Sequence, residues 1–515
     1  MSYSIVDVSN WETVSEEHPG YIGEREKEWL KEPLTGKLAM FKIPREDRGE
    51  HWAEKLCSEL AASLSFPCAK VELAIRDGVY GSLSYFFVEK EKGYSHFDSG
   101  SFFNYTYNDE GRIEYNIEVI EEFLEKSNLF ADFLYIVLFD ALIANGDRHQ
   151  DNWGITRHEK EDTVAISPMY DNSASLGRDL SRGNIEKFIS SDSELLRHLF
   201  KGRAKIGMKD KRGANHFALI RFLKSKYPEK FKGLFTSLSN LEDHLVEEIV
   251  DMVPEEILDV EYKRVVTKFI QFRRDILLNI GDDMDKNINE LLLVWKEPES
   301  RQRYVVGKLI YNGDENKYIF SYLSENLQEA VSVGFKNYPS FPDLGETYES
   351  KGQLFPGLMN RLPNKKRPNY PEILLKYNLD TTSTVMEILG ATRGRLGTDN
   401  FEFVQFIEFI QNQPFQITFD LAAARRYDFP SVKGEIKENE VVTLIRDIDN
   451  QVDVNAVRVI YRDNLCLGYV PRYYSEDLAA MLEAGVQYKA IIKKLDILND
   501  NPDEWAKIKV EVIYE

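Results

Sequence analysis

Hydrophobic and polar positions divide the chain into four stretches with different periodicity. Residues 1–95 contain short apolar runs around one helical segment, which predicts a β-rich unit. Residues 96–295 are mostly helical, because apolar and charged positions alternate at helical spacing in segments such as HFALIRFLKSKY and LEDHLVEEIVDMV. Residues 300–410 and 415–515 again favour strands, separated by turns that contain Pro and Gly. The pattern predicts an α+β protein made of these four parts.

The most apolar stretch runs from Leu129 to Ala144, LFADFLYIVLFDALIA. Because it is apolar on nearly every side, we expect a buried helix and not an amphipathic surface helix. The stretch is short for a membrane span and contains Asp132 and Asp140, so we expect no membrane segment. We expect Gly146 to end the helix and to let the chain turn into a polar loop.

That polar loop carries the candidate chemistry. Asp147 and Asn152 stand five residues apart in NGDRHQDNWGI, and Asp171 follows an apolar run from Thr163 to Met169 that reads as a strand. In phosphoryl transfer, one carboxylate takes the proton of the acceptor hydroxyl, while an amide oxygen and a second carboxylate hold magnesium. The D-x-x-x-x-N spacing matches that of kinase catalytic loops. The structural alternative stays open, since an Asn-Gly-Asp sequence is often only a turn.

A cation is available from the N-terminal stretch. Lys42 lies in the apolar strand LAMFKIPR, and Glu54 follows twelve residues later in a predicted helix. Kinases use such a pair to aim the lysine at nucleotide phosphates, although a strand lysine can also extend to solvent. Gly20 and Gly23 in GYIGEREK could form a loop over the phosphates, or simply a turn.

Composition narrows the classes of partner. The formal net charge of -21 argues against global attraction to nucleic acid or anionic lipid, so such binding would need a local patch. The three cysteines are scattered without a CxxC pair, which fits a reducing cytosol and argues against structural zinc. The first residues, MSYSIVDVSNWE, lack a basic and an apolar signal region. We therefore expect a cytoplasmic protein.

Residues 20–280 resemble the HipA-like kinases, including the compact CtkA-type serine/threonine kinases. The resemblance rests on LAMFKIP, AEKLCSELAASLSFP, LIANGDRHQDNWGI and SPMYDNSASLG. It implies a two-lobed protein-kinase-like fold that uses ATP and magnesium, with residues 1–95 as N-lobe and 96–295 as C-lobe. Phosphoinositide kinases also carry a G-D-R-H-x-x-N loop, so a lipid substrate stays open. The implied roles are nucleotide binding by Lys42, Glu54 and Gly23, proton transfer by Asp147, and magnesium binding by Asn152 and Asp171.

Two further resemblances concern the rest of the chain. Residues 303–405, within the unit at 300–410, resemble the small N-terminal subdomain of HipA-type proteins, which implies packing and a partner surface. Residues 415–515 resemble a HIRAN domain through LIRDIDNQVDVNAVRV and LGYVPR. HIRAN domains are OB-like small barrels, and some of them capture single-stranded DNA ends. The nucleic-acid residues implied here are Tyr427, Asp453, Tyr469, Arg472 and Tyr473.

This last segment departs from the HIRAN pattern in two respects. Val452 precedes the turn residue Asp453, where the family often has an aromatic residue. The segment also holds 13 Lys and Arg against 18 Asp and Glu, which weakens electrostatic attraction to DNA.

The leading hypothesis is an ATP- and magnesium-dependent protein serine/threonine kinase of HipA type with a HIRAN-like sensor or targeting module. The same resemblance implies a role as a toxin or as a stress or defence kinase. The expected partners are a protein substrate, an antitoxin or regulator, and a single-stranded DNA end. Two alternatives stay open: a DNA-end binding protein with a regulatory kinase-like domain, and a lipid or small-molecule kinase.

Overall fold

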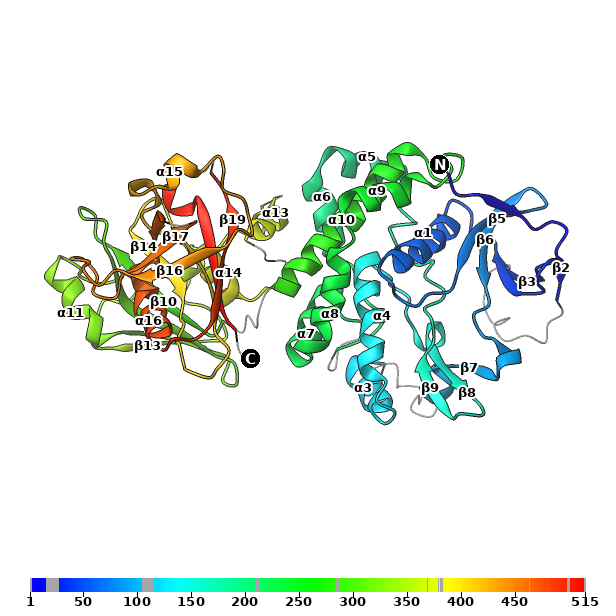
Figure 1. Cartoon of the computed structure of the whole chain (residues 1–515), viewed down its shortest axis with the longest axis horizontal. Helices are drawn as coiled ribbons and strands as arrows, with labels where there is room; N and C mark the ends of the chain where they lie inside the picture. Colours follow the sequence, from blue (N-terminus) through cyan, green and yellow to red (C-terminus); the bar gives the residue numbers. More distant parts are fainter. Residues whose placement is uncertain are drawn as a thin grey trace. The chain divides into compact units, whose positions relative to one another are not determined.

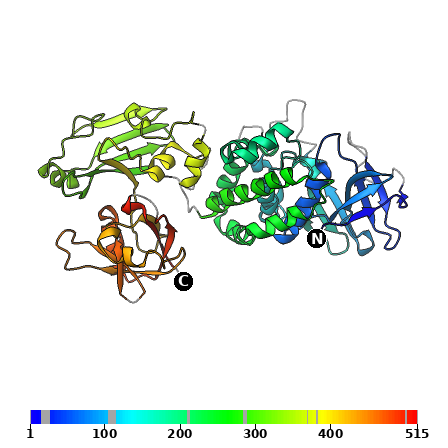
Figure 2. The same cartoon turned by 90° about the horizontal axis from the view of Figure 1, so that it is seen from above.

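The computed structural model describes residues 2–14, 27–103, 115–208, 213–282, 288–367, 369–377, 379, 383–462, 464–497 and 501–513 (Figures 1 and 2). These residues cluster into two compact units. Unit 1 comprises Met1–Asp283 and Asn364–Ser383, and unit 2 comprises Met284–Pro363 and Thr384–Glu515. No helix in the described ranges is both long and apolar enough to cross a membrane.

The N-terminal lobe of unit 1 is a mixed sheet with one long helix against it. The strand order is β1-β5-β6-β4-β3-β2, and all neighbours are antiparallel except β1 and β5. Helix α1 (Glu50–Ser63) packs against β5 and β6, which places one of its faces over the centre of the sheet (Figure 1). The strands are β1 (Ile5–Asp7), β2 (Glu12–Thr13), β3 (Lys27–Lys31), β4 (Leu38–Lys42), β5 (Val71–Arg76) and β6 (Val79–Tyr85).

The second lobe of unit 1 is helical and surrounds α4 (Phe130–Ile143). Helix α4 packs against α3, α7, α8 and α10, and most of its side chains are buried, which confirms the predicted core helix. The helices are α2 (Gly100–Phe103), α3 (Ile117–Glu125), α5 (Arg182–Ser190), α6 (Asp192–Leu199), α7 (His216–Lys226), α8 (Pro228–Ser239), α9 (Asp243–Asp251), α10 (Val260–Asp282) and α13 (Tyr370–Lys376), the last of which packs against α6.

A small antiparallel sheet, β7-β8-β9, lies beside these helices. Its strands are β7 (Tyr94–Asp98), β8 (Gly154–His158) and β9 (Thr163–Ile166). The expected end of the core helix at Gly146 is wrong: the helix ends earlier, and Ala144 takes the left-handed conformation with φ of 54°. The backbone N–H groups of Ala144 and Asn145 both donate to the carbonyl of Asp140, so the cap forms before Gly146 is reached.

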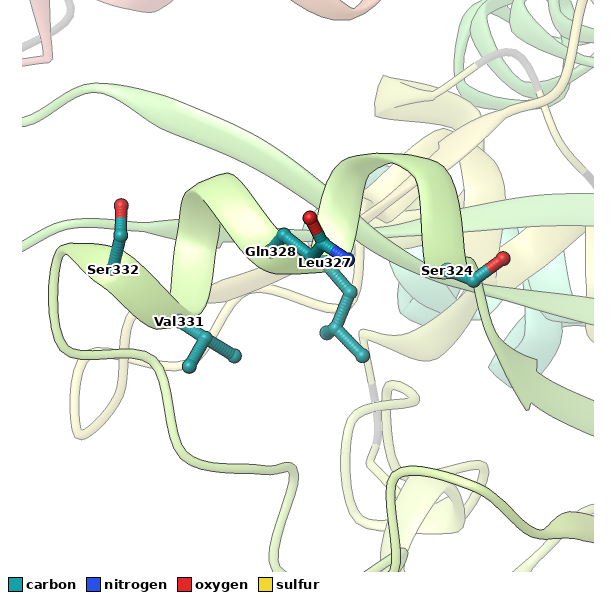
Figure 3. Close-up of a pocket in the computed structure, with 5 residues that line it drawn as sticks. All are labelled: Ser324, Leu327, Gln328, Val331 and Ser332. Atoms are coloured by element: carbon teal, nitrogen blue, oxygen red, sulfur yellow. The ribbon is translucent and has the colours of Figure 1, made fainter.

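Unit 2 begins with an antiparallel sheet of order β13-β12-β11-β10-β14. A shallow pocket lies along its helix α11 (Ser324–Ser332), and Leu327 and Val331 extend to the same side of that helix (Figure 3). Gln328, Ser324 and Ser332 complete the lining. The other elements are β10 (Glu290–Lys296), β11 (Arg303–Asn312), β12 (Lys317–Tyr322), β13 (Thr347–Lys351), α12 (Pro356–Met359), α14 (Val385–Thr392) and β14 (Phe401–Gln405).

The C-terminal part of unit 2 contains two further antiparallel sheets, β15-β20-β19 and β16-β17-β18. Bridges between Ala422 and Tyr469 and between Val441 and Ile491 connect the two sheets, an arrangement compatible with the predicted small barrel. The elements are β15 (Gln416–Asp420), α15 (Phe429–Val432), β16 (Val442–Arg446), β17 (Val457–Tyr461), β18 (Leu465–Tyr469), α16 (Arg472–Glu483), β19 (Tyr488–Leu495) and β20 (Ala506–Val512).

The two parts of unit 2 share one apolar core and one buried ionic cluster. Leu292, Val294 and Val404 of the first sheet belong to the same buried cluster as the C-terminal strands. Beside it, the carboxylate of Glu402 accepts hydrogen bonds from Nε of Arg303 at 2.9 Å and from Nε of Arg395 at 2.6 Å.

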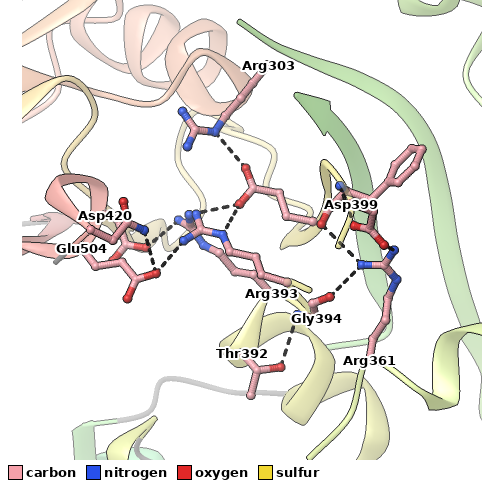
Figure 4. A network of polar contacts seen from close by, with 12 residues as sticks. Arg303, Arg361, Thr392, Arg393, Gly394, Asp399, Asp420 and Glu504 are labelled. Atoms are coloured by element: carbon pink, nitrogen blue, oxygen red, sulfur yellow. Dashed lines mark hydrogen bonds and ion pairs between the residues drawn. The ribbon is translucent and has the colours of Figure 1, made fainter. Parts of the chain in front are cut away.

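The cluster continues across the junction between the two parts. Arg393 contacts Glu402 at 3.4 Å and Asp420 of β15 at 2.9 Å (Figure 4). Burial alone would raise the pKa of Glu402, but the guanidinium groups of Arg393, Arg395 and Arg303 hold it at about 2.

We expect Glu402→Gln to destabilise unit 2 by about 3–5 kcal/mol at neutral pH, because three arginines then lose a buried anion. The folded pKa of Glu402, about 2, lies below its ordinary value of 4.5. The stabilisation is therefore complete above pH 4.5 and is lost as the pH falls toward 2, so the difference between the two proteins shrinks in acid. The free energy of unfolding is measured at each pH by urea unfolding of the full chain, with hydrogen exchange in peptides from β14 and β15 as the readout.

The exposed Glu483 ion pair with Arg446 provides the matched control. Glu483→Gln removes the same charge from the surface and should change stability by less than about 1 kcal/mol. Equal effects of the two substitutions would contradict the importance of the buried cluster.

Candidate active site

The N-terminal lobe presents a lysine that is held by two carboxylates. Lys42 ends β4, and its Nζ lies 2.9 Å from Oε1 of Glu54 on α1 and 3.3 Å from Oδ1 of Asp171. Ser82, the register partner of Lys42 on β6, donates its hydroxyl to the other Glu54 oxygen at 2.8 Å. The side chain of Glu54 is 2% exposed and that of Lys42 is 13% exposed. The ammonium is therefore fixed in a mostly buried setting.

Local backbone packing determines where Lys42 lies. A Cβ atom on Gly81 would come within 2.5 Å of the Lys42 carbonyl, so only glycine allows β6 to approach β4 this closely. Burial lowers the pKa of Lys42, but the carboxylates of Asp171 and Glu54 outweigh burial and raise it above the ordinary value. Lys42 is therefore a permanent cation at neutral pH.

The loop after α4 holds Asp147 and Asn152 in a defined arrangement. The side-chain oxygen of Asn145 accepts the backbone N–H of Asp147 at 3.0 Å, and Nδ2 of Asn152 donates to the Asp147 carbonyl at 2.8 Å. Because its NH₂ group is used in this way, the amide oxygen of Asn152 is the atom suited to a cation. The side chain of Asp147 is 45% exposed, so its carboxylate is accessible from solvent.

Arg148 joins this loop to the segment that carries Asp171. The guanidinium is fully buried and makes two hydrogen bonds to the carboxylate of Asp140, at 3.0 and 2.7 Å. The same group donates to the carbonyls of Asn152 at 2.7 Å and Tyr170 at 2.9 Å, and to Oδ1 of Asn172 at 2.5 Å. Asn152 and Asp171 are therefore brought together by one side chain.

Asp171 itself has a constrained backbone. Its φ is 51°, a left-handed conformation that Asp tolerates better than most residues. Ser173 donates its hydroxyl to Oδ1 of Asp171 at 3.1 Å, on the same oxygen that Lys42 contacts. The backbone N–H of Gly146 bonds to the Ala174 carbonyl at 3.3 Å, so the two loops are also linked through the main chain.

The arrangement offers a cation few protein ligands of its own. Within the described ranges, no group of three or more His, Cys, Asp or Glu side chains could hold a metal ion. One carboxylate, from Asp171, and one amide oxygen, from Asn152, fit the way magnesium binds between a protein and nucleotide phosphates.

The sequence reasoning missed Asp140, Arg148, Ser82 and Asn172, whose hydrogen bonds hold the predicted residues or the loops that carry them. One signal was available. Asp140 interrupts an otherwise apolar buried helix, and a buried carboxylate needs a partner. The sequence did not identify Arg148 as that partner. Gly23, predicted to approach the phosphates, lies outside the described residues, as does Gly20.

The predicted nucleic-acid residues of the C-terminal segment have different surroundings. The rings of Tyr427 and Tyr469 lie 5.1 Å apart, and the Tyr469 hydroxyl donates to Asp447 at 2.6 Å. Asp453 accepts the backbone N–H of Asn455 at 2.9 Å and so shapes the loop between β16 and β17.

Arg472 and Tyr473 face the first sheet of unit 2. Arg472 pairs with Glu329 of α11 at 3.0 Å and lies over the ring of Tyr304. Tyr473 lies beneath the guanidinium of Arg393, within the buried ionic cluster. Of these candidates, Tyr427 and Tyr469 form the aromatic pair.

Comparisons with known proteins match two separate parts of the chain to two family models. Residues 20–218 match the model of the HipA-like C-terminal domain, and residues 415–515 match that of the HIRAN domain. A search of curated proteins found no match. The chain is similar to the solved Helicobacter pylori proinflammatory kinase CtkA, with 16% identity over 55% of this chain and 100% of that one and a TM-score of 0.46.

Two other solved structures are also similar. HipA of Shewanella oneidensis MR-1, in a complex of a toxin–antitoxin system with HipB and operator DNA, has 13% identity over 53% of this chain and 69% of that one, with a TM-score of 0.34. The HIRAN domain of human HLTF has 17% identity over 20% of this chain and 81% of that one, with a TM-score of 0.16.

Two of the three family resemblances inferred from the sequence are thus confirmed by the family models, each within the segment where it was expected. The resemblance of residues 303–405 to the small N-terminal subdomain of HipA-type proteins stays a prediction. The chain therefore joins a segment that matches the HipA-like C-terminal domain to a C-terminal segment that matches the HIRAN domain.

Proposed function

We propose that the protein is an ATP- and magnesium-dependent kinase that phosphorylates a serine or threonine hydroxyl of a protein. The observation that carries the proposal is the Lys42 ammonium, which lies 2.9 Å from Glu54 and 3.3 Å from Asp171. These residues come from two lobes, and the Arg148 hydrogen bonds place Asn152 next to the segment of Asp171. A convergence of this kind suits the terminal phosphates of a nucleotide.

Each side chain has a distinct task in this proposal. Lys42 attracts the phosphates, and Glu54 with Ser82 keeps its ammonium in place. Asn152 and Asp171 would hold magnesium, which supplies positive charge to the phosphates when it is bound. Asp147 accepts the proton of the acceptor hydroxyl, so that the acceptor oxygen can bond to phosphorus. Catalysis then comes mainly from placement and charge neutralisation.

We expect Asp147→Asn to lower phosphoryl transfer by roughly 10²–10⁴-fold, because the amide cannot accept the proton. The full chain is incubated with magnesium and γ-labelled ATP, alone and with a mixture of cellular proteins, and labelled protein is quantified. Asp151→Asn is the matched control, since it removes the same charge from the same loop at a solvent-exposed position. Unchanged labelling by Asp147→Asn would rule out the assigned base.

The same assay separates the substrate classes. Parallel reactions with phosphoinositide vesicles and with small-molecule hydroxyl acceptors test the lipid or small-molecule alternative. Label in such an acceptor and none in protein would replace the protein-kinase assignment with that alternative. Label in none of them, including the chain itself, would remove the support for an active kinase.

We expect Lys42→Met to weaken nucleotide binding by roughly 10- to 100-fold, since a charge-assisted contact contributes about 1.5–3 kcal/mol. Titration with a fluorescent ATP analogue in the presence of magnesium measures the affinity. Lys70→Met is the control, because Lys70 is an exposed lysine that pairs with Glu72 on the same sheet. If both variants bind the analogue as the wild type does, Lys42 does not contact the phosphates.

We infer a second function for the HIRAN domain, contact with the end of a single DNA strand. The specific observation is the pair of rings formed by Tyr427 and Tyr469, of which Tyr427 is 41% exposed. Two exposed arginines, Arg425 and Arg426, directly precede Tyr427 in the chain. Aromatic rings beside cationic groups suit base stacking and backbone attraction. Arg472 and Tyr473 contribute less, because they already contact the neighbouring sheet and helix.

We expect Tyr427→Ala to weaken binding of a short single-stranded oligonucleotide by roughly tenfold or more, since stacking contributes about 1–3 kcal/mol per base. Fluorescence anisotropy with the full chain measures this, and an oligonucleotide with a blocked 3′ end is the matched control ligand. Equal binding of free and blocked ends would contradict end capture. No binding of either by the wild type would remove this second function while leaving the kinase proposal intact.

A further inference from the structure

Lys205 is a cation near the candidate base that no motif of the loop indicates. Its Nζ lies 4.0 Å from Oδ1 of Asp147, and the two side chains are 56% and 45% exposed. An ion pair this exposed contributes little to stability. The pair therefore matters more for the positive charge that it places beside Asp147 than for the stability of the fold.

The backbone around Lys205 is fixed. Ala204 and Ile206 are buried while Lys205 between them is exposed, so the alternation turns the lysine outward. The N–H of Ala204 donates to the Ala214 carbonyl at 2.8 Å, and the N–H of Gly207 donates to the Tyr115 carbonyl at 2.9 Å. This short extended segment therefore has anchors on both sides of Lys205.

One of these anchors also reaches the catalytic loop. The hydroxyl of Tyr115 donates to the carbonyl of Arg148 at 3.0 Å and accepts Nε1–H of Trp153 at 2.8 Å. A Cβ on Gly146 would lie 3.7 Å from the carbonyl of Arg203, so the segment and the loop are in close contact. Lys205 and Asp147 are thus held by one connected scaffold.

A cation beside Asp147 would have negative charge to neutralise during phosphoryl transfer. Arg148, next to Asp147 in the chain, is turned into the core and pairs with Asp140. Lys42 is already paired with Glu54 and Asp171. A phosphoryl group that arrives at an acceptor held by Asp147 brings negative charge next to a carboxylate, and like charges repel.

We propose that Lys205 is a further catalytic residue, which neutralises the phosphoryl group on the acceptor side of the site and steadies the Asp147 carboxylate. This proposal rests on the proposed kinase function. In the step, the acceptor oxygen forms a bond to the γ-phosphorus and its proton passes to Asp147. The bond from phosphorus to the β–γ bridging oxygen breaks, and ADP leaves with that electron pair. Lys205 keeps its protons and supplies charge only.

The test measures kcat and the KM for ATP of the full chain, with the protein acceptor or autophosphorylation found for the wild type. Lys205→Met should lower kcat roughly 10- to 100-fold and change the KM for ATP less than about twofold, because the lost contact forms in the transition state. Lys205→Arg keeps the charge and should retain activity within about threefold. Lys201→Met, at an exposed position of the same segment, is the matched control and should behave as the wild type.

The outcomes are distinguishable from failure of the kinase proposal. If the wild type is active, Asp147→Asn is inactive and Lys205→Met has the kcat of the wild type, the role of Lys205 is overturned and the kinase stands. If the wild type transfers phosphate to no acceptor, both proposals fall. A purely structural role predicts a lower melting temperature and no rescue by Lys205→Arg, and that result also overturns the proposal.

Discussion

The candidate active site depends on one buried guanidinium. Arg148 uses Nε, Nη1 and Nη2 to hold the carboxylate of Asp140, two backbone carbonyls and the side chain of Asn172. Removing a charged pair from water costs several kcal/mol per ion, and only a nearly complete set of hydrogen bonds offsets that cost. Because the set spans two loops and the core helix, movement of either loop would leave a buried charge without partners. The loops are therefore held together.

The N-terminal lobe solves a similar problem with a different pair. Lys42 and Glu54 are mostly buried, and each is stabilised by further contacts, with Asp171 for the lysine and Ser82 for the glutamate. Asp171 belongs to the other lobe, so the ion pair between Lys42 and Asp171 depends on the position of the loop that Arg148 holds. The left-handed backbone of Asp171 is tolerated in this setting, because the surrounding hydrogen bonds fix the loop.

In unit 2, the HIRAN domain and the preceding sheet are not independent surfaces. Leu292, Val294 and Val404 complete the apolar core of the C-terminal strands, and Arg393 contacts carboxylates on both sides of the junction. The consequence for function is that Arg472 and Tyr473, which the motif alone presents as surface residues, are engaged inside the unit. Among the described residues of this part, Tyr427 is the one exposed aromatic side chain.

Residue types and their spacing were enough to predict the main elements and the kind of chemistry. Periodicity located the core helix, and the spacing of Asp147, Asn152 and Asp171 with the Lys42 and Glu54 pair indicated a phosphoryl-transfer centre. Which side chains hold these groups together became visible only in the folded chain. Ser82 reaches Glu54 because two segments that are distant in the chain pack together, and Arg148 reaches Asp140 because the loop residue turns inward. Such contacts leave no local periodicity, because they depend on where whole elements come to lie. The early helix end at Ala144 has the same origin, since hydrogen bonds to Asp140 outweigh the preference of glycine for a turn.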